Sequence, residues 1–562
     1  MRSFLRQHHR IIFYLSWTVL VILQAYYTEL QDDEAYYWVY SLFPAAGYFD
    51  HPPMIALLIR AGTFFKATEL TIRLFPLILN ILSIYITEKL IDDKNKGLFY
   101  AICYSVGILH LAGFFAVPDI PLVFFSGLLF LIYKKYLVTP TWRYAILIGI
   151  VTSLMLYSKY HGVLVLFFIL LSNPRLFVDK KIITAGFVAL ICFLPHLIWQ
   201  YQHGWISVKY HLSERSADAY DFLFTSDYLL GQLLLLGPFA GFFLWPISFI
   251  YHPKDLLEKA FKWVVIGFFI FFLISTLKGR VEANWTAPVI IPMMVMGYRF
   301  LSSHLNWRKW FYRILPASVA IIFFARIITV INLIPVEPIV ERYFAWKTWP
   351  QQLIKTTKGN PVVFNSNYQR ASKYWFYSKD TCYSLNSFAE RQNNYNYWPI
   401  EEKLSGKPVY VMDIYRTDTF PTRIKTPLWT IGYTKENFYY SFVKVRFTPE
   451  HFNYRIGNSD VLKIPFTVTI PAEYKSFLLQ HPEIDMPLKI ALLDREFPIK
   501  EIYTGYCLQD ILSNNIHEVT IDPRLLNGKY ICMFVLGSSD GTYTRNSEKI
   551  KLEINAPTPK GE

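Results

Sequence analysis

The 562-residue chain is too apolar for an ordinary soluble protein, because 53% of its residues are hydrophobic, 18% are aromatic and its mean hydropathy is +0.25. Its formal net charge of +14 does not indicate a nucleic-acid-binding protein, since many of its lysines and arginines gather in short loops between apolar runs. The composition predicts a polytopic membrane protein.

Eleven apolar runs in the first part of the chain are each long enough to cross roughly 30 Å of hydrocarbon as a helix. A shorter run, residues 53–65, carries Arg60 and is followed by Lys66, so it predicts a helix that lies in the membrane interface. We therefore expect about 11 to 13 spans in total. The eleven runs cover residues 11–28, 71–91, 98–117, 120–138, 142–158, 162–178, 182–200, 227–251, 261–277, 286–302 and 310–334.

The short loops predict the orientation of the spans, because lysine and arginine are retained on the cytoplasmic side of a membrane. Every second loop is basic, beginning with the amino-terminal segment that holds Arg2, Arg6 and Arg10. With that segment inside, an odd number of spans puts the carboxyl-terminal region outside. The first apolar run has no small-residue cleavage site, so we expect it to remain as an anchor.

After about residue 335 the hydropathy falls, and short strand-like runs alternate with turns. Residues 1–335 are therefore predicted to form the membrane domain, and the remainder a water-facing region. Its first part, residues 336–445, mixes strand-like runs with one helical stretch and predicts an α/β subdomain. Its second part, residues 446–562, consists almost entirely of strand-like runs and predicts a β-sandwich.

Acidic and basic residues cluster at the edges of spans on the predicted outer face. This pattern suits a group transfer from an anionic, lipid-tethered donor, in which cations hold the phosphate while a carboxylate handles the acceptor. Ionisable groups of a transporter site would more often lie near the middle of the membrane. The clusters are "DDEAYYW" (32–38), "AVPDIP" (116–121), "YSKYHG" (157–162), "KYHLSER" (209–215) and "KGRVEANW" (278–285).

Three short motifs carry a resemblance to a known superfamily. The outward D-E-A-x-Y at residues 33–37, then G-Y-F-D-H-P-P at 47–53, then P-D-x-P at 118–121 resemble motifs of the GT-C membrane glycosyltransferases. Within these, the chain is similar to the bacterial aminoarabinose transferases and to their protein O-mannosyltransferase relatives, which use dolichyl-phosphate-mannose. The resemblance covers roughly residues 1–335.

The resemblance implies a GT-C fold and an inverting transfer of a sugar from a polyprenyl-phosphate donor. It implies an acceptor reached from the periplasmic face of the bacterial inner membrane. The acceptor is expected to be lipid A, an envelope glycan or a protein, and neither the sugar nor the polyprenol is specified. The role of the carboxyl-terminal region is likewise left open.

The resemblance also assigns roles to residues. Asp33 matches the catalytic carboxylate, and Asp50 matches a second catalytic acid of the same loop. The aminoarabinose transferases have a lysine after that acid where this chain has His51, and a neutral imidazole is a weaker phosphate partner than an ammonium.

The chemistry of such a transfer needs a base near the acceptor and positive charge on the departing phosphate. A polyprenyl phosphate leaves readily, so no general acid is required. The predicted phosphate clamps and other substrate-binding residues are Glu34, His51, Asp119, Lys159, His211, Arg215, Lys278 and Arg280.

Three other interpretations stay open. Asp50, with His51 and His211, could supply ligands for a divalent metal such as zinc, although the sequence assigns no definite metal ligand. A transporter or lipid flippase would place charges inside the membrane, for which Arg326 in the last run is the candidate. A non-catalytic envelope scaffold would tolerate loss of the Asp33 carboxylate.

Overall fold

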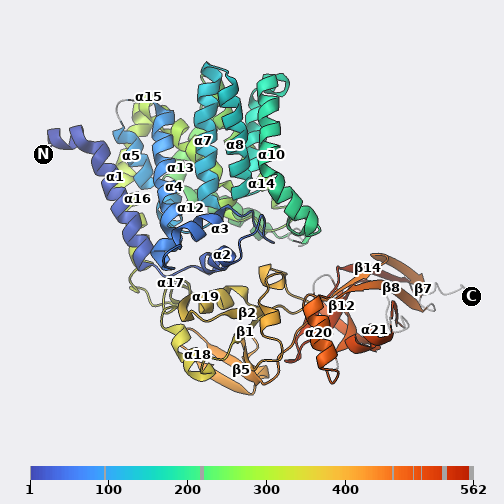
Figure 1. The fold of residues 1–562 in the computed structure, drawn as a ribbon. Coiled ribbons are helices and arrows are strands. Elements are labelled where there is room, and N and C mark those ends of the chain that lie inside the picture. The colour runs from blue at the N-terminus through green and yellow to red at the C-terminus, as the bar shows by residue number, and fades with distance from the viewer. Residues whose placement is uncertain are drawn as a thin grey trace, which may run out of the picture. The chain divides into compact units, whose positions relative to one another are not determined.

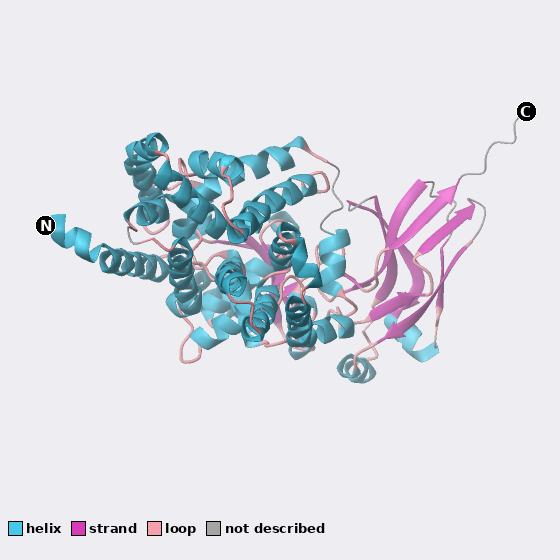
Figure 2. Ribbon diagram, turned by 90° about the horizontal axis from the view of Figure 1, so that it is seen from above, coloured by secondary structure: helices cyan, strands magenta, loops and turns pink. Residues whose placement is uncertain are grey.

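The computed structural model describes residues 2–93, 96–214, 220–457, 461–484, 486–494, 497–514, 516–521 and 528–555. The chain divides into two compact units between Phe344 and Ala345, whereas the sequence predicted a boundary at residue 335. Helices build the first unit, and all of the described strands belong to the second (Figures 1 and 2).

The first unit is a bundle of long helices with shorter ones at its ends (Figure 1). Its elements are α1 (Arg2–Tyr27), α2 (Asp32–Leu42), α3 (Met54–Gly62), α4 (Glu69–Ile91), α5 (Gly97–Ser105), α6 (Gly107–Leu111), α7 (Asp119–Val138), α8 (Trp142–Ser158), α9 (Gly162–Ser172), η1 (Pro174–Val178), α10 (Lys180–Gln202), α11 (Ile206–Lys209), η2 (Tyr210–Glu214), α12 (Phe222–Leu236), α13 (Gly241–Ile250), α14 (Leu256–Ser275), η3 (Ala283–Val289), α15 (Ile290–Ser303), α16 (Leu305–Ile328) and α17 (Glu337–Tyr343).

The predicted apolar runs all contain helix, but the predicted number of spans is not confirmed. Among the described residues, five helices are long and apolar enough to cross a membrane, or six if the bent pair α12 and α13 counts as one span. The eleven predicted runs include several that the structure interrupts or shortens. Run 162–178, for example, ends its α-helix at Ser172 and continues as η1.

Two of the interrupted runs break where they meet each other. Run 98–117 is split at Val106 into α5 and α6, while run 227–251 is split into α12 and α13, which are bent by 103°. A Cβ atom built on Gly237 would lie 2.4 Å from the Ser105 carbonyl oxygen, and one on Gly107 would lie 3.0 Å from the Gly237 Cα. Gly237 also has a φ of 114°, which side-chain-bearing residues rarely adopt. The two breaks therefore depend on these glycines.

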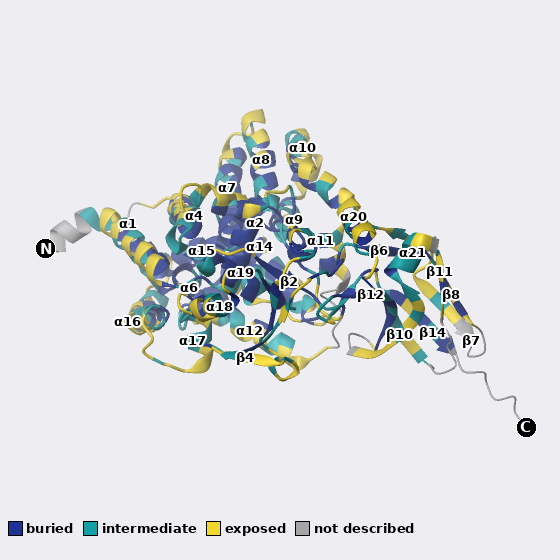
Figure 3. Ribbon diagram, turned by 60° about the horizontal axis from the view of Figure 1, so that its bottom comes forward, coloured by how far each residue is buried: buried dark blue, intermediate teal, exposed yellow. Residues whose placement is uncertain are grey.

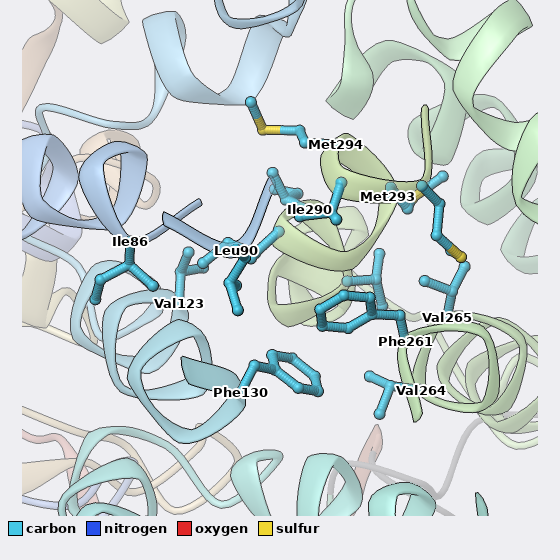
Figure 4. Close-up of a cluster of buried hydrophobic side chains, with 14 of the residues drawn as sticks. Ile86, Leu90, Val123, Phe130, Phe261, Val264, Val265, Ile290, Met293 and Met294 are labelled. Carbon is cyan, nitrogen blue, oxygen red and sulfur yellow. The ribbon is translucent and has the colours of Figure 1, made fainter. Parts of the chain in front are cut away.

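The core of the first unit centres on α15, in which every residue from Ile290 to Tyr298 is buried. Figure 4 shows side chains of α4, α7, α14 and α15 converging there, including Phe130 of α7 and Phe261 of α14, whose rings meet edge to face at 4.9 Å. By contrast, α1 and α10 keep exposed apolar sides (yellow in Figure 3). Such faces suit contact with lipid chains.

The second unit begins with a mixed five-stranded sheet in the order β2-β1-β3-β5-β4. β1 lies parallel to β2 and β3, with Val362 opposite both Cys382 and Tyr410, and α19 makes the crossover from β1 to β2. Its elements are α18 (Trp349–Thr357), β1 (Val362–Asn365), α19 (Tyr368–Ser378), β2 (Cys382–Leu385), η4 (Asn394–Asn396), η5 (Glu401–Lys403), β3 (Val409–Asp413), η6 (Thr417–Thr419), β4 (Thr422–Lys425) and β5 (Thr430–Glu436).

The later strands form two sheets that share a core. One has the order β10-β9-β12-β14-β7 with β13 paired to β12, and the other has the order β11-β8-β6. Phe534 of the first sheet contacts Phe447 and Phe466 of the second at 5.4 and 5.3 Å, as expected for packed sheets. The elements are β6 (Arg446–Pro449), β7 (Asn453–Gly457), β8 (Leu462–Thr469), α20 (Ala472–Gln480), β9 (Pro487–Asp494), β10 (Phe497–Cys507), α21 (Leu508–Asn514), β11 (Glu518–Ile521), β12 (Gly528–Gly537), β13 (Tyr543–Arg545) and β14 (Ile550–Asn555).

Candidate active site

The acidic loop after α1 folds into the short helix α2, whose first turn holds Asp32, Asp33 and Glu34. Carboxylates are favourable there because the free N–H groups and the dipole of a helix attract negative charge at its N-terminus. A capping box with Gln31 begins the helix, in which the Gln31 backbone N–H donates to Glu34 Oε2 at 3.0 Å. Asp33 is exposed, Asp32 is half-buried and Glu34 is fully buried.

The buried Glu34 side chain is held by Arg73 of α4. Arg73 Nε donates to Glu34 Oε1 at 2.8 Å and Nη2 donates to Oε2 at 2.6 Å, with both side chains fully buried. The Ala116 backbone N–H also donates to Oε1 at 2.8 Å. Glu34 is thus fully engaged inside the protein, so the geometry favours a structural role over the predicted substrate-binding one.

The same guanidinium ties the end of α1 to α4. Arg73 Nη1 donates to the carbonyls of Ala25 and Thr28 at 2.8 and 2.7 Å, and Nη2 donates to that of Glu29 at 3.1 Å. Arg73 therefore satisfies carbonyls that the end of α1 leaves without helical partners. In doing so it fixes the position at which α2 starts, and with it Asp33.

Asp50 lies in the next part of the loop and is buried, with only 6% of its surface exposed. The Tyr40 hydroxyl donates to Asp50 Oδ2 at 3.3 Å. The rings of Tyr40 and Tyr48 are tilted by 31° with their centroids 4.2 Å apart, and the Tyr48 hydroxyl donates to the carbonyls of Tyr40 and Phe43, both at 3.0 Å. Burial raises the pKa of Tyr48 to about 12 and that of Tyr40 well above its ordinary value, so both phenols stay protonated donors at neutral pH.

Residues near the end of α10 hold this loop in place. Gln200 donates to Ser207 Oγ at 2.7 Å, and Ser207 Oγ donates to the Tyr48 carbonyl at 2.8 Å. His196 Nδ1 contacts the Ala46 carbonyl at 2.8 Å. Sequence reasoning missed these residues, although His196 and Gln200 stand four apart in an otherwise apolar run and so share one helix face.

His211 approaches the same loop from η2. Its Nε2 atom lies 2.9 Å from the Asp50 backbone carbonyl. The structure thus brings two of the predicted residues together. Among the described residues, no group of three or more His, Cys, Asp or Glu side chains is arranged to hold a metal ion. The present residues therefore do not fit the tetrahedral zinc site considered from the sequence, and we derive no step through a metal.

A second group gathers around Asp119, the first residue of α7. Lys159 Nζ donates to Asp119 Oδ1 at 2.8 Å, and Asn284 Nδ2 donates to Oδ2 at 3.0 Å. Asp119 and Lys159 are both nearly buried, so the pair is neutralised inside the protein. Lys159 was predicted to clamp phosphate, but its ammonium is already engaged by a carboxylate. Asn284, which contacts Asp119, is not among the predicted substrate-binding residues although it lies in the same cluster as Lys278 and Arg280.

Three consecutive residues connect the two groups. Lys159 contacts Asp119, whereas the Tyr160 hydroxyl lies 3.0 Å from His196 Nε2 and its ring lies 5.6 Å from that of His211. Burial raises the pKa of Tyr160 well above its ordinary value. The ring of His161 lies 5.0 Å from that of Trp285. The loop between α8 and α9 is therefore the common support of the site.

The remaining predicted residues differ in their exposure and contacts. Lys278 and Arg280 are exposed, and Arg280 lies 3.7 Å from Glu282. Among the described residues, the Lys278 ammonium makes no hydrogen bond or ion pair. His51 contacts Tyr37 ring to ring at 5.6 Å. Arg215 lies outside the described residues. Asp33, Lys278 and Arg280 are the predicted site residues that the structure leaves exposed.

Arg326, the candidate charge for a transport pathway, is a structural residue in this fold. Its Nη1 donates to the His110 carbonyl at 3.2 Å and its Nη2 donates to the Leu20 carbonyl at 2.6 Å. Arg326 thus links α16 to α1 and to the broken helix α6. Because its guanidinium is bound to backbone oxygens, Arg326 is poorly placed to bind a transported solute.

Comparisons with known proteins agree with this arrangement. Residues 50–199 match the family of dolichyl-phosphate-mannose-protein mannosyltransferases. The lipid A galacturonosyltransferase RgtD of Rhizobium johnstonii is 25% identical over 311 residues, which are 52% of this chain and 64% of that protein. The match therefore spans less than two thirds of the relative.

The fold has solved counterparts. The crystal structure of ArnT from Cupriavidus metallidurans in the apo state superposes with a TM-score of 0.56 and 12% identity, covering 76% of this chain and 97% of that one. The structure of the same protein bound to undecaprenyl phosphate gives a TM-score of 0.55, also at 12% identity, covering 75% and 97%. In sequence the chain is thus similar to membrane glycosyltransferases, and in fold it is similar to the aminoarabinose transferase structures, which are of the GT-C type.

Proposed function

We propose that this multi-pass bacterial membrane protein transfers a sugar from a polyprenyl-phosphate donor to an acceptor of the cell envelope. The observation that carries the proposal is the exposed Asp33 carboxylate at the first turn of α2, held by the buried Glu34–Arg73 pair. The structural relative bound to undecaprenyl phosphate supports the donor class. The active site is proposed to face the periplasm, because the basic loops predict that side for α2.

Lipid A is the acceptor that we favour among the three predicted classes. The support is the 25% identity to a lipid A galacturonosyltransferase over 52% of the chain. An envelope glycan and a protein are the other acceptors that the experiment below tests. The nature of the sugar follows from the same measurement.

In the proposed reaction, an acceptor oxygen attacks the anomeric carbon of the donor sugar. A new glycosidic C–O bond forms as the bond to the phosphate breaks, and the polyprenyl phosphate leaves with the electron pair. Attack from the face opposite the leaving group inverts the anomeric centre. Asp33 takes the proton when the acceptor is a hydroxyl. Lys278 and Arg280, with Arg215, are proposed to stabilise charge on the departing phosphate.

Asp50 has a different proposed role from Asp33. It is buried and bound by Tyr40 and lies in the loop that His211 contacts. A carboxylate so enclosed is better placed to fix the shape of the loop than to accept a proton from a substrate. We propose that Asp50 and His51 shape the donor site next to α3.

The test is donor-dependent transfer by purified Asp33→Asn and Asp32→Asn variants. Asp33→Asn keeps the side-chain shape and removes the base, so turnover should fall by about 10² to 10⁴ with donor binding kept, whereas Asp32→Asn should do much less. A phosphate acceptor is already ionised and needs a base less, which makes the loss smaller. Both cases require Asp33 to matter more than Asp32, and near-normal turnover by Asp33→Asn overturns the assignment.

The acceptor is identified by mass spectrometry of lipid A, envelope glycans and envelope proteins from cells with and without the gene. We expect one sugar to disappear from lipid A alone. Loss from a glycan or a protein replaces lipid A as the acceptor. No change in any of the three classes contradicts the proposed activity.

A further inference from the structure

A basic hollow opens at the first turn of α14, far from the candidate active site. Its volume is about 550 Å³, and Lys254, Lys259 and Lys262 lie in its wall. The 20-residue helix α14 leads from this hollow toward η3, where Asn284 bonds Asp119. At a rise of 1.5 Å per residue, that helix separates the hollow from the active site by about 30 Å, which is the thickness of the hydrocarbon core of a membrane.

An apolar hollow continues from the basic one along α14. Its volume is about 500 Å³, and it shares Lys262 and Trp263 with the basic hollow. Phe168 of α9 and Ile270 of α14 line it. A Cβ atom on Gly267 would lie 2.4 Å from the Phe168 ring, so the glycine lets that ring rest against the backbone of α14. The two hollows form one amphipathic surface, which is basic at the start of α14 and apolar further along that helix.

The three lysine ammonium groups at the basic end differ in whether the protein already binds them. Lys262 Nζ donates to the carbonyls of Phe249 and Tyr251 at 2.8 and 2.7 Å, so it belongs to the framework. Lys254 and Lys259 are exposed, and within the described part of the chain their ammonium groups make no hydrogen bond or ion pair. The basic end therefore offers two ammonium groups to a ligand.

The carboxylate of Asp255, which also lines the hollow, is already used by the protein. Its Oδ1 atom accepts the Glu258 backbone N–H at 2.8 Å, which caps α14, and its Oδ2 atom lies 3.9 Å from Arg299 Nη1. The helix N-terminus is thus occupied by its own cap. An anion at this place would be held by Lys254 and Lys259 instead.

We propose that this surface binds an anionic glycerophospholipid of the membrane leaflet opposite the active site. The phosphate of the headgroup lies between Lys254 and Lys259, Trp263 lies at the level of the glycerol, and an acyl chain follows Phe168 and Ile270. Basic pockets beside membrane helices favour such headgroups. The roughly 30 Å between this surface and Asp119 separates the phospholipid from the proposed sugar donor. The site stands whether or not the proposed transfer is correct.

The main test is native mass spectrometry of the purified full-length protein with phosphatidylglycerol and with phosphatidylcholine. The double variant Lys254→Ala and Lys259→Ala should bind phosphatidylglycerol about 30-fold more weakly, with little change for phosphatidylcholine. The matched control changes Lys180 and Lys309 to Ala. Both are exposed lysines that belong to basic loops outside the two hollows.

A second variant tests the apolar hollow without a change in charge. Ile270→Trp fills the hollow, so it should weaken binding of dioleoyl phosphatidylglycerol by about tenfold and leave the dihexanoyl form unaffected. The proposal is overturned if the Lys180 and Lys309 control loses as much phosphatidylglycerol binding as the double variant. It is also overturned if the native protein shows no preference for phosphatidylglycerol, or if undecaprenyl phosphate displaces phosphatidylglycerol. The last result would make the surface a site for the donor lipid.

Discussion

Replacing Arg73 by methionine should destabilise the first unit and impair the active site at the same time. The substitution keeps an unbranched apolar side chain but leaves the Glu34 carboxylate buried without its cation. Both partners of this pair are fully buried at 2.6 Å. Removing one partner of a buried ion pair typically costs about 3 to 5 kcal/mol. The substitution also leaves the carbonyls of Ala25, Thr28 and Glu29 without the Arg73 donor. We expect the thermal midpoint to fall by about 5 to 10 °C.

Two further variants separate charge from shape. Arg73→Lys keeps the charge but cannot make the forked contact to both oxygens of Glu34, so it should recover part of the midpoint. The double variant Glu34→Leu with Arg73→Met removes both charges and should be more stable than Arg73→Met alone. A double-mutant cycle over these variants isolates the pair from the contacts to the carbonyls.

The assay is thermal unfolding of the full chain in one detergent, followed by transfer by the folded fraction below the midpoint. If Glu34 and Arg73 position Asp33, the folded fraction of Arg73→Met should lose turnover while Asp32→Asn does not. A midpoint within roughly 1 °C of that of the native protein, which is the size of a small surface effect, would refute the claim that this pair holds the first turn of α2.

Three further outcomes are expected. Gly47→Ala should lower transfer more than stability, because its Cβ atom would lie 2.4 Å from the Trp199 ring and push the loop that holds Asp50; unchanged kinetics would show that the loop adapts. Burial raises the pKa of Glu401 to about 7 from an ordinary 4.5, so its contribution to the stability of the second unit is fully present below pH 4.5 and is lost, by about 3 kcal/mol, as the pH rises through 7. The free energy of unfolding of Glu401→Gln, followed by near-ultraviolet circular dichroism at several pH values, should lack that pH dependence. An unaltered pH dependence would assign it to another group. Metal analysis of purified protein should find less than one zinc per chain, because Asp50 and His211 meet through a backbone carbonyl; stoichiometric zinc would contradict this ligand assessment.

Helices that depend on local apolarity were predictable from the sequence, whereas breaks that depend on distant contacts were not. Run 142–158 became α8 with the same bounds, because a continuous apolar run flanked by polar residues specifies its own ends. The break at Val106 depends on Gly237, which lies in another run, and no local signal at Ser105 or Gly107 reveals that approach. For this reason the predicted number of spans is not confirmed by the helices that the structure describes.

The candidate site, too, was predictable from the sequence only where its signal is local. The sequence identified the acidic first turn and the P-D-x-P acid, since unusual charge at the edge of a span is visible locally. It does not reveal that Glu34 is engaged inside the protein, because its partner Arg73 stands 39 residues further along the chain. It also took Lys159 for an available cation, because the sequence alone does not reveal that Lys159 and Asp119 neutralise each other.

The pairing of Glu34 with Arg73 also determines the order in which the loop can fold during synthesis of the protein. During synthesis α1 and the acidic loop emerge first, and the only cation that contacts Glu34 among the described residues arrives later in α4. A lone carboxylate is too costly to bury, so the loop has to stay hydrated until α4 has inserted beside α1. The acidic loop can therefore close only after at least two helices are in the membrane. Truncated chains released from the ribosome into membranes should expose the loop to aqueous protease when they end before residue 69, while chains that include all of α4 should protect it.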